Sequence, residues 1–210
     1  MKSRFITLEG GEACGKSTQI GRLRLRLEKT GQPVVALREP GGTPLGESIR
    51  HLLKHAPEGE GMTSEAELLL FAASRAQLVR TVIEPALAEG KWVLCDRYGD
   101  STTVYQGLAR RIPAEAVAAI NGFAMGDVRP GLTVVLEVDP AEAARRLKMR
   151  GGALPDRMER EPEDFYRRVR EGYRTLAEWE PERIKILSAS GSPDEVEAAL
   201  WSLVQHAFSL

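Results

Sequence analysis

The sequence predicts an α/β fold in which a five-stranded parallel sheet is flanked by helices on both faces. Short apolar runs rich in β-branched residues recur along the chain, and helical stretches separate them. Nearly unbroken apolar runs are typical of strands that are covered on both faces. A glycine-rich loop after the first run has the spacing of a phosphate-binding turn between a strand and a helix.

The elements follow in order from these patterns. We expect strands at Arg4–Glu9, Val34–Arg38, Trp92–Asp96, Leu132–Val138 and Ile184–Leu187. We expect helices at Lys16–Thr30, Leu45–Lys54, Ser64–Ala88, Ser101–Arg110, Ala114–Gly126, Ala141–Arg150, Glu163–Glu180 and Asp194–Phe208. Loops are expected at Ala56–Gly61 and at Gly151–Pro162, which contains a Gly-Gly pair and two prolines.

Helix starts are marked by serine. Ser64 and Ser192 each stand three residues before a glutamate, Glu67 and Glu195, which is the pattern of a capping box. Pro85 is expected to kink or end the third helix.

Composition limits the function classes. The chain has 210 residues, with 42% hydrophobic and 28% charged, which predicts a single globular domain. A formal net charge of -1 argues against a nucleic-acid partner held by overall charge. The longest apolar run is too short to cross a membrane, and no signal-peptide core is visible, so we expect a cytoplasmic protein. Cys14 and Cys95 are too few for a disulfide framework.

The glycine-rich loop is the strongest motif. Residues 10–17 read Gly-Gly-Glu-Ala-Cys-Gly-Lys-Ser and fit G-x-x-x-x-G-K-[ST]. Backbone N–H groups of such a loop surround a β-phosphate, Lys16 reaches the β and γ oxygens, and Ser17 is a ligand for Mg²⁺. The alternative is a strand-to-helix turn that matches by chance.

A second motif lies at the end of the third strand. Asp96 is suitably placed to organise a magnesium ion, and Arg97 to grip a phosphate with two bonds, unless the two form a structural ion pair. Phe71 and Arg75 share one helix face, where Phe71 either stacks on a base or belongs to the core. The Gly-Gly pair in Arg38–Thr43 indicates close backbone approach or a turn.

Taken in order, these motifs resemble the thymidylate kinases of the bacterial type over essentially the whole chain. The segments that carry the resemblance are Glu9–Thr18, Arg38–Thr43, Phe71–Arg75 and Asp96–Gly107. The resemblance implies a P-loop NTPase fold of the nucleoside monophosphate kinase type. It also implies transfer of the γ-phosphate of ATP to dTMP with Mg²⁺, giving dTDP for dTTP synthesis, in a homodimer. No nucleic-acid or membrane partner is expected.

The resemblance also implies a role for individual residues. ATP would be held by residues 10–18, which are Gly10, Gly11, Glu12, Ala13, Cys14, Gly15, Lys16, Ser17 and Thr18. The dTMP contacts would be Glu12 at the 3′-hydroxyl, Pro40 beside the base, Phe71 stacked on thymine, Arg75 at the base edge, Arg97 on the phosphate, Ser101 or Thr102 at the pyrimidine, Tyr105 under the deoxyribose and Gln106. Ser17 and Asp96 would hold the metal.

Arginines of a mobile lid are expected to complete the catalytic set. The phosphate loop has no arginine, whereas eight basic residues lie between Arg145 and Arg168. Such a run is usually a solvated helix face, but phosphoryl transfer needs neutralised oxygens. In one branch of the family that the chain resembles, a phosphate-loop arginine neutralises the transferring phosphate, and in the other branch arginines of a mobile lid do so. The resemblance therefore implies a lid around residues 145–162, with Arg150 and Arg157 joining Lys16 and Arg97 as catalytic residues.

Two positions and two rival functions stay open at this stage. The family often has Gly-Ala where this chain has Ala13-Cys14, so a positive φ at Ala13 would cost about 1 kcal/mol. Cys14 is either a thiol whose modification blocks ATP or a buried, inert cysteine. A deoxynucleoside kinase would need Asp96 or Glu9 as a general base, and a non-catalytic nucleotide-binding module would show no transfer.

Overall fold

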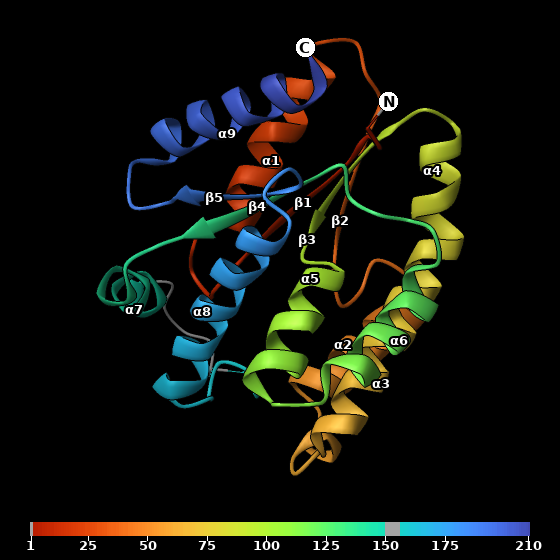
Figure 1. Cartoon of the computed structure of the whole chain (residues 1–210), viewed down its shortest axis with the longest axis vertical. Helices are drawn as coiled ribbons and strands as arrows, with labels where there is room; N and C mark the ends of the chain where they lie inside the picture. Colours follow the sequence, from red (N-terminus) through yellow and green to blue (C-terminus); the bar gives the residue numbers. More distant parts are fainter. Residues whose placement is uncertain (1, 150–155) are drawn as a thin grey trace.

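The computed structural model describes residues 2–149 and 156–210 (Figure 1). In this part of the chain five strands form one parallel sheet in the order β2-β3-β1-β4-β5, which confirms the predicted fold class. The strands are β1 (Phe5–Gly10), β2 (Val34–Arg38), β3 (Trp92–Asp96), β4 (Leu132–Glu137) and β5 (Ile184–Ser188). Their bounds differ from the predicted ones by one residue at most.

Helices cover both faces of the sheet (Figure 1). One face carries α1 (Lys16–Glu28) and α9 (Pro193–Phe208), and an apolar core that includes Leu23, Leu94 and Leu200 fills the space beneath them. The other face carries α4 (Glu84–Ala88), α5 (Gly99–Thr102) and α8 (Glu163–Trp179). The remaining α-helices are α2 (Pro44–Lys54), α3 (Ser64–Leu78), α6 (Ala114–Met125) and α7 (Pro140–Met149). No helix in the described residues is long and apolar enough to cross a membrane.

Two stretches that the sequence predicted as plain α-helix contain π-helical turns. Residues Val79–Ile83 (η2) separate α3 from α4, so the interruption comes just before Pro85. Residues Thr103–Ala109 (η3) follow α5 and carry Tyr105 and Gln106. Widened turns of this kind occur often at functional sites, and hydrophobic spacing alone does not distinguish them from α-helix.

The capping prediction is right at one helix and wrong at another. Ser192 and Glu195 form the expected capping box at the start of α9. At α3 the cap is Thr63, whose hydroxyl accepts from the N–H of Ala66 at 3.3 Å. Glu67 is therefore not a capping residue; it is buried and bonded to side chains of other segments.

A short 3₁₀ turn, η1 (Pro57–Gly59), lies within the predicted loop at residues 56–61. Pro57 opens this turn, as the fixed φ of proline favours. The loop is therefore more regular than its composition indicated.

Candidate active site

The segments that follow β1, β2 and β3 meet at the carboxyl edge of the sheet. In the register, Asp96 of β3 lies opposite Leu8 of β1 on one side and opposite Arg38 of β2 on the other. The N–H of Arg97 continues the ladder to the Leu8 carbonyl at 3.0 Å, and the N–H of Glu39 to the Asp96 carbonyl at 2.9 Å. Residues far apart in sequence are thereby brought beside the phosphate loop.

The phosphate loop is held by close backbone packing. A Cβ on Gly10 would lie 2.3 Å from the carbonyl oxygen of Leu136 on β4, so only glycine fits there. The loop ends at Gly15, whose φ of 93° favours glycine, and α1 begins at Lys16. The Lys16 ammonium donates to the Gly11 carbonyl at 2.7 Å, which keeps it folded over the loop.

Ala13 and Cys14 occupy the positions that the sequence left open. Ala13 has a φ of 55°, so the condition for local strain is met. Cys14 is 2% exposed, and its thiol donates to the Gly11 carbonyl at 3.1 Å. This burial favours the interpretation of an inert cysteine.

The two predicted metal ligands touch each other. Ser17 Oγ donates to Asp96 Oδ2 at 2.9 Å. A hydroxyl and a carboxylate are the hard oxygen donors that Mg²⁺ prefers, so the pair fits this ion.

A cavity of about 310 Å³ joins the phosphate loop to the segments after β2 and β3. Its lining contains nearly every residue expected to contact the acceptor: Glu12, Pro40, Phe71, Arg97, Ser101, Tyr105 and Gln106. Lys16, Ser17 and Asp96 line the same cavity. Donor and acceptor residues therefore share one space.

Arg97 lies at the junction of these two groups. Its guanidinium donates to Glu12 at 2.8 Å and to Ser101 at 3.2 Å, and lies over the Tyr105 ring at 4.9 Å from its centre. Burial opposes ionisation of Glu12, but the charges of Arg97 and Lys16 outweigh it and lower the pKa of Glu12 to about 2. Arg97 also has a φ of 72°, which is rare for a residue with a side chain.

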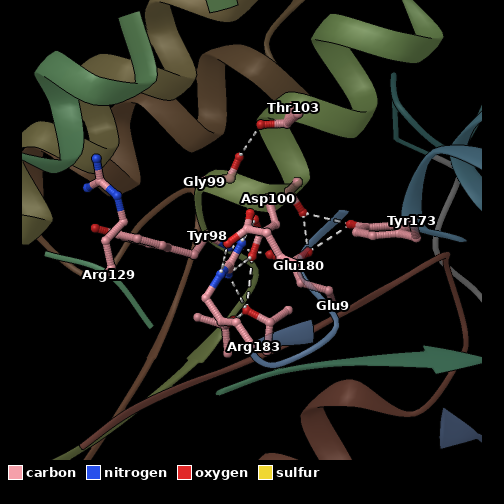
Figure 2. A network of polar contacts seen from close by, with 12 residues as sticks. Glu9, Tyr98, Gly99, Asp100, Thr103, Arg129, Tyr173, Glu180 and Arg183 are labelled. Carbon is pink, nitrogen blue, oxygen red and sulfur yellow. Dashed lines mark hydrogen bonds and ion pairs between the residues drawn. The ribbon is translucent and has the colours of Figure 1, made fainter. Parts of the chain in front are cut away.

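The buried carboxylate of Glu9 accepts three hydrogen bonds (Figure 2). They come from the N–H of Tyr98 at 2.8 Å, the hydroxyl of Ser101 at 2.6 Å and the hydroxyl of Tyr173 on α8 at 2.7 Å. Burial and the nearby charge of Asp100 raise the pKa of Glu9, and the charge of Arg97 together with the bonds from Ser101 and Tyr173 offsets only part of that rise. The carboxylate links the start of the phosphate loop to α5 and α8.

Arg75 is placed differently from its predicted role. It is 1% exposed and is not among the residues that line the cavity. Four of its N–H groups donate to protein acceptors, which are Glu39, Thr102, Asn121 and the Tyr98 carbonyl, and its Nη2 also lies 2.7 Å from the Glu39 carboxylate. A bond to a base would require Arg75 to release one of them.

Two buried polar atoms at the cavity have no partner within the described residues. They are Oε1 of Glu39 and the hydroxyl of Tyr105. Buried polar atoms are nearly always paired, so these two indicate a place where a ligand or water belongs. Burial raises the pKa of Glu39 to about 7 despite the opposing charge of Arg75.

The predicted lid arginines are only partly described. Arg150 lies outside the described residues. Arg157 is not at the phosphate loop: it donates to the Leu53 carbonyl at 2.9 Å and to Glu67 at 2.6 Å. Arg145 lines a second hollow of about 570 Å³, which adjoins Ala13 and Gly15 on the phosphate loop.

Several cavity residues were not singled out from the sequence. Arg50 and Lys54 follow each other by one turn of α2 and line the cavity, as do His55 and Asp156. The i,i+4 spacing of two basic residues just after the Arg38–Thr43 loop was a usable signal for the first pair. Asp156 pairs with Lys54 at 2.7 Å across more than a hundred residues, and no sequence pattern announces this contact.

Comparison with known proteins identifies the family. The thymidylate kinase family model matches residues 8–200. The chain belongs to the thymidylate kinase family. It is 48% identical over 203 residues to a thymidylate kinase of Deinococcus radiodurans, covering 96% of each chain. It is 46% identical over 207 residues to one of Rhodopseudomonas palustris, covering 98% of this chain and 90% of the other.

A solved structure agrees with these relatives. The crystal structure of a thymidylate kinase from Ehrlichia chaffeensis superposes with a TM-score of 0.77 at 32% identity, covering 96% of this chain and 97% of that one. The chain is thus a thymidylate kinase, which phosphorylates dTMP to dTDP. The predicted family, fold and reaction are confirmed.

Proposed function

We propose that ATP is held by the phosphate loop, that dTMP fills the 310 Å³ cavity, and that the γ-phosphate passes directly between them. The observation that carries this proposal is the shared lining. Lys16 and Ser17 of the loop border the same cavity as Phe71 and Gln106. Arg97 lines this cavity too, and it donates a hydrogen bond to Glu12 of the loop. Reacting groups held in one enclosed space gain most from positioning.

On the donor side, Gly10–Thr18 surround the phosphates of ATP. The 570 Å³ hollow beyond the loop is lined by Thr18, Arg145 and Arg146, and it suits the nucleoside part of ATP. Planar guanidinium groups stack well on aromatic bases, which supports this orientation. The donor would then run from this hollow, past Gly15, to the acceptor cavity.

On the acceptor side, Phe71 stacks on thymine, Pro40 lies beside the base, and Tyr105 lies under the deoxyribose. Ser101 and Gln106 face the pyrimidine, and Glu12 receives the 3′-hydroxyl. The low pKa of Glu12 keeps it an acceptor at neutral pH. We assign Arg75 an indirect part, because its donors already hold Glu39 and Thr102 against the cavity.

Mg²⁺ would be held by Ser17 and Asp96, whose oxygens already lie 2.9 Å apart. When bound, the ion supplies positive charge to the phosphate oxygens of ATP.

The chain's own residues then need to position the two substrates and to neutralise the charge on their phosphate oxygens. The acceptor phosphate is ionised at neutral pH, so its oxygen attacks without a strong general base. Lys16 and Arg97 compensate the charge on the donor and acceptor oxygens. Arg157 would join them only after leaving Glu67, and Arg150 remains a second candidate from the expected lid at residues 145–162.

A coupled assay of ADP release tests this function. We expect turnover with dTMP, less with dUMP and dCMP, and none with thymidine, which lacks the acceptor phosphate. Preference for thymidine would instead indicate a nucleoside kinase. No turnover with any acceptor would indicate a non-catalytic nucleotide-binding module.

We further propose a cytoplasmic homodimer of single-domain chains. Phe123 on α6 is 85% exposed and Leu69 on α3 is 55% exposed, and these two helices pack together. Large exposed apolar side chains on adjacent helices support an interface. Sedimentation of Phe123→Glu should give a monomer where the unchanged chain gives a dimer, and an unchanged dimer would place the interface elsewhere.

A further inference from the structure

The amide of Gln106 is held from behind by a buried carboxylate. We propose that Glu67 is a positioning residue which decides the base that the cavity accepts, by fixing the orientation of this amide. Nε2 of Gln106 donates to Oε1 of Glu67 at 2.7 Å. The inference rests on the proposed binding of a pyrimidine monophosphate in the cavity.

Glu67 is fixed by side chains of two other segments, residues 106–110 and Arg157. It is 1% exposed and lies on α3. Arg110 donates to both of its oxygens, at 3.2 and 3.1 Å, and Arg157 donates to Oε2 at 2.6 Å. Arg110 is itself held by Glu161 at 2.5 Å. The carboxylate therefore cannot rotate without breaking several charged hydrogen bonds.

The charge state of Glu67 determines which end of the amide it accepts. Burial opposes its ionisation, but hydrogen bonds from Arg110 and Gln106 and the charges of Arg110 and Arg157 prevail and lower its pKa. An ionised carboxylate has acceptors only. Gln106 must then present its NH₂ group to Glu67, and the alternative orientation would set two oxygens against each other.

The opposite end of the amide is left for the ligand. Gln106 lines the cavity, and no donor in the described residues is bonded to its Oε1. A carbonyl oxygen here pairs with an N–H of the bound base. N3 of thymine and uracil carries a hydrogen, whereas N3 of cytosine carries a lone pair. The fixed carbonyl therefore favours dTMP and dUMP and disfavours dCMP.

The arrangement separates two kinds of discrimination. The 5-methyl group distinguishes thymine from uracil by shape, and the amide of Gln106 does not read it. The N3 position distinguishes both from cytosine by hydrogen bonding. A change at Glu67 should alter the second ratio and spare the first, whereas general damage to the cavity would alter both.

The test is Glu67→Gln, with kcat/KM measured for dTMP, dUMP and dCMP. A neutral amide at position 67 presents either an acceptor or a donor, so Gln106 is free to turn. We expect the dTMP to dCMP ratio to fall about tenfold, the scale of one neutral hydrogen bond, while the dTMP to dUMP ratio stays within about twofold. Glu161→Gln is the control: it removes a partner of Arg110, leaves Glu67 charged, and should keep both ratios.

A second variant keeps the test valid if Glu67→Gln folds poorly. Gln106→Met removes the carbonyl and leaves Glu67 with its arginines, so it should also lower the dTMP to dCMP ratio about tenfold. Unchanged ratios in both variants, or in the folded one alone, would overturn the role of Glu67. An unchanged chain that does not turn over dTMP would overturn the proposed site instead, so the two failures are distinguishable.

Discussion

The two sides of the cavity are built in different ways. The donor side is one continuous stretch, residues 10–17, whose shape comes from backbone packing and from the turn at Gly15. The acceptor side combines side chains that follow β2 and β3 with side chains of α3 and η3. Its members are held by buried charged groups such as Arg75 and Glu67 rather than by neighbours in sequence.

This difference determines how each side should respond to substitution. On the donor side functional side chains such as Lys16 extend from a backbone loop, so the loss of Lys16 should remove activity and leave the fold intact. On the acceptor side the supporting side chains are part of the interior. Their loss should lower the stability of the protein as well as affect substrate binding.

The largest expected effect is on the donor side. Lys16→Ala should lower kcat by about 10³, because one positioned charge at the transferring phosphate is lost. The midpoint of urea unfolding should hardly change. The control is Lys29→Ala at the exposed C-cap of α1, for which kcat should be unchanged. If Lys16→Ala transferred phosphate at the normal rate, the phosphate loop would have no part in the mechanism.

The acceptor side should show the reverse behaviour. Arg75→Met leaves the buried carboxylate of Glu39 without its ion-pair partner, and breaking a buried pair costs about 3–5 kcal/mol in the free energy of unfolding. The loss should be smaller below the Glu39 pKa of about 7, where the carboxyl group takes up a proton. Denaturant unfolding at pH 6 and pH 8 measures both effects.

Arg80 offers a matched control, because it lies in η2, which directly follows the helix that carries Arg75. Arg80→Met removes an exposed i,i+4 pair with Glu84, which is worth less than about 1 kcal/mol. Adding Glu39→Gln to Arg75→Met should recover much of the lost stability, since no charge is then left buried. Equal losses for Arg75→Met and Arg80→Met would contradict the contrast between the two sides.

The same contrast explains what the sequence predicted well. The strands are continuous apolar runs, and the phosphate loop is a fixed spacing, so both are properties of contiguous residues. Asp96 and Arg97 were also found, because the carboxyl ends of parallel strands adjoin each other. These features need only local patterns and the rules of sheet topology.

The features that sequence reasoning missed depend on tertiary contacts. Glu67 stands at the spacing of a capping residue, but burial beside Arg110 and Gln106 gives it a different role. The π-helical turns of η3 contain residue types that also occur in α-helices, so composition does not distinguish them. Arg157 is expected near a phosphate from its charge, yet its position is set by the Leu53 carbonyl and Glu67, which are distant in sequence.

The donor and acceptor sides join at Glu12, because its backbone belongs to the donor loop and its side chain pairs with Arg97. Its pKa is lowered from 4.5 to about 2, so its stabilising effect is complete above pH 4.5 and is lost as the pH falls toward 2. Glu12→Gln should be less stable than the unchanged chain at pH 6 by at most about 3 kcal/mol. The difference should shrink by pH 3.

Unfolding in urea at the two pH values measures this difference. Glu58→Gln, at an exposed loop position, serves as the control and should follow the unchanged chain at both. A difference for Glu12→Gln that stays constant with pH would show that the Glu12–Arg97 ion pair does not stabilise the fold.

The smallest effect concerns the backbone of the donor loop itself. Ala13 has a φ of 55°, where an L-residue costs about 1–2 kcal/mol relative to glycine, while glycine costs about 0.5–1 kcal/mol in unfolded-state entropy. Ala13→Gly should therefore stabilise the protein by about 0.5 kcal/mol. Ala118→Gly, on the exposed face of α6, should destabilise it by about 1 kcal/mol, because no positive φ offsets the entropy there. Opposite signs in thermal unfolding for the same chemical change would show that backbone conformation, not side-chain contact, sets the energetics of the phosphate loop.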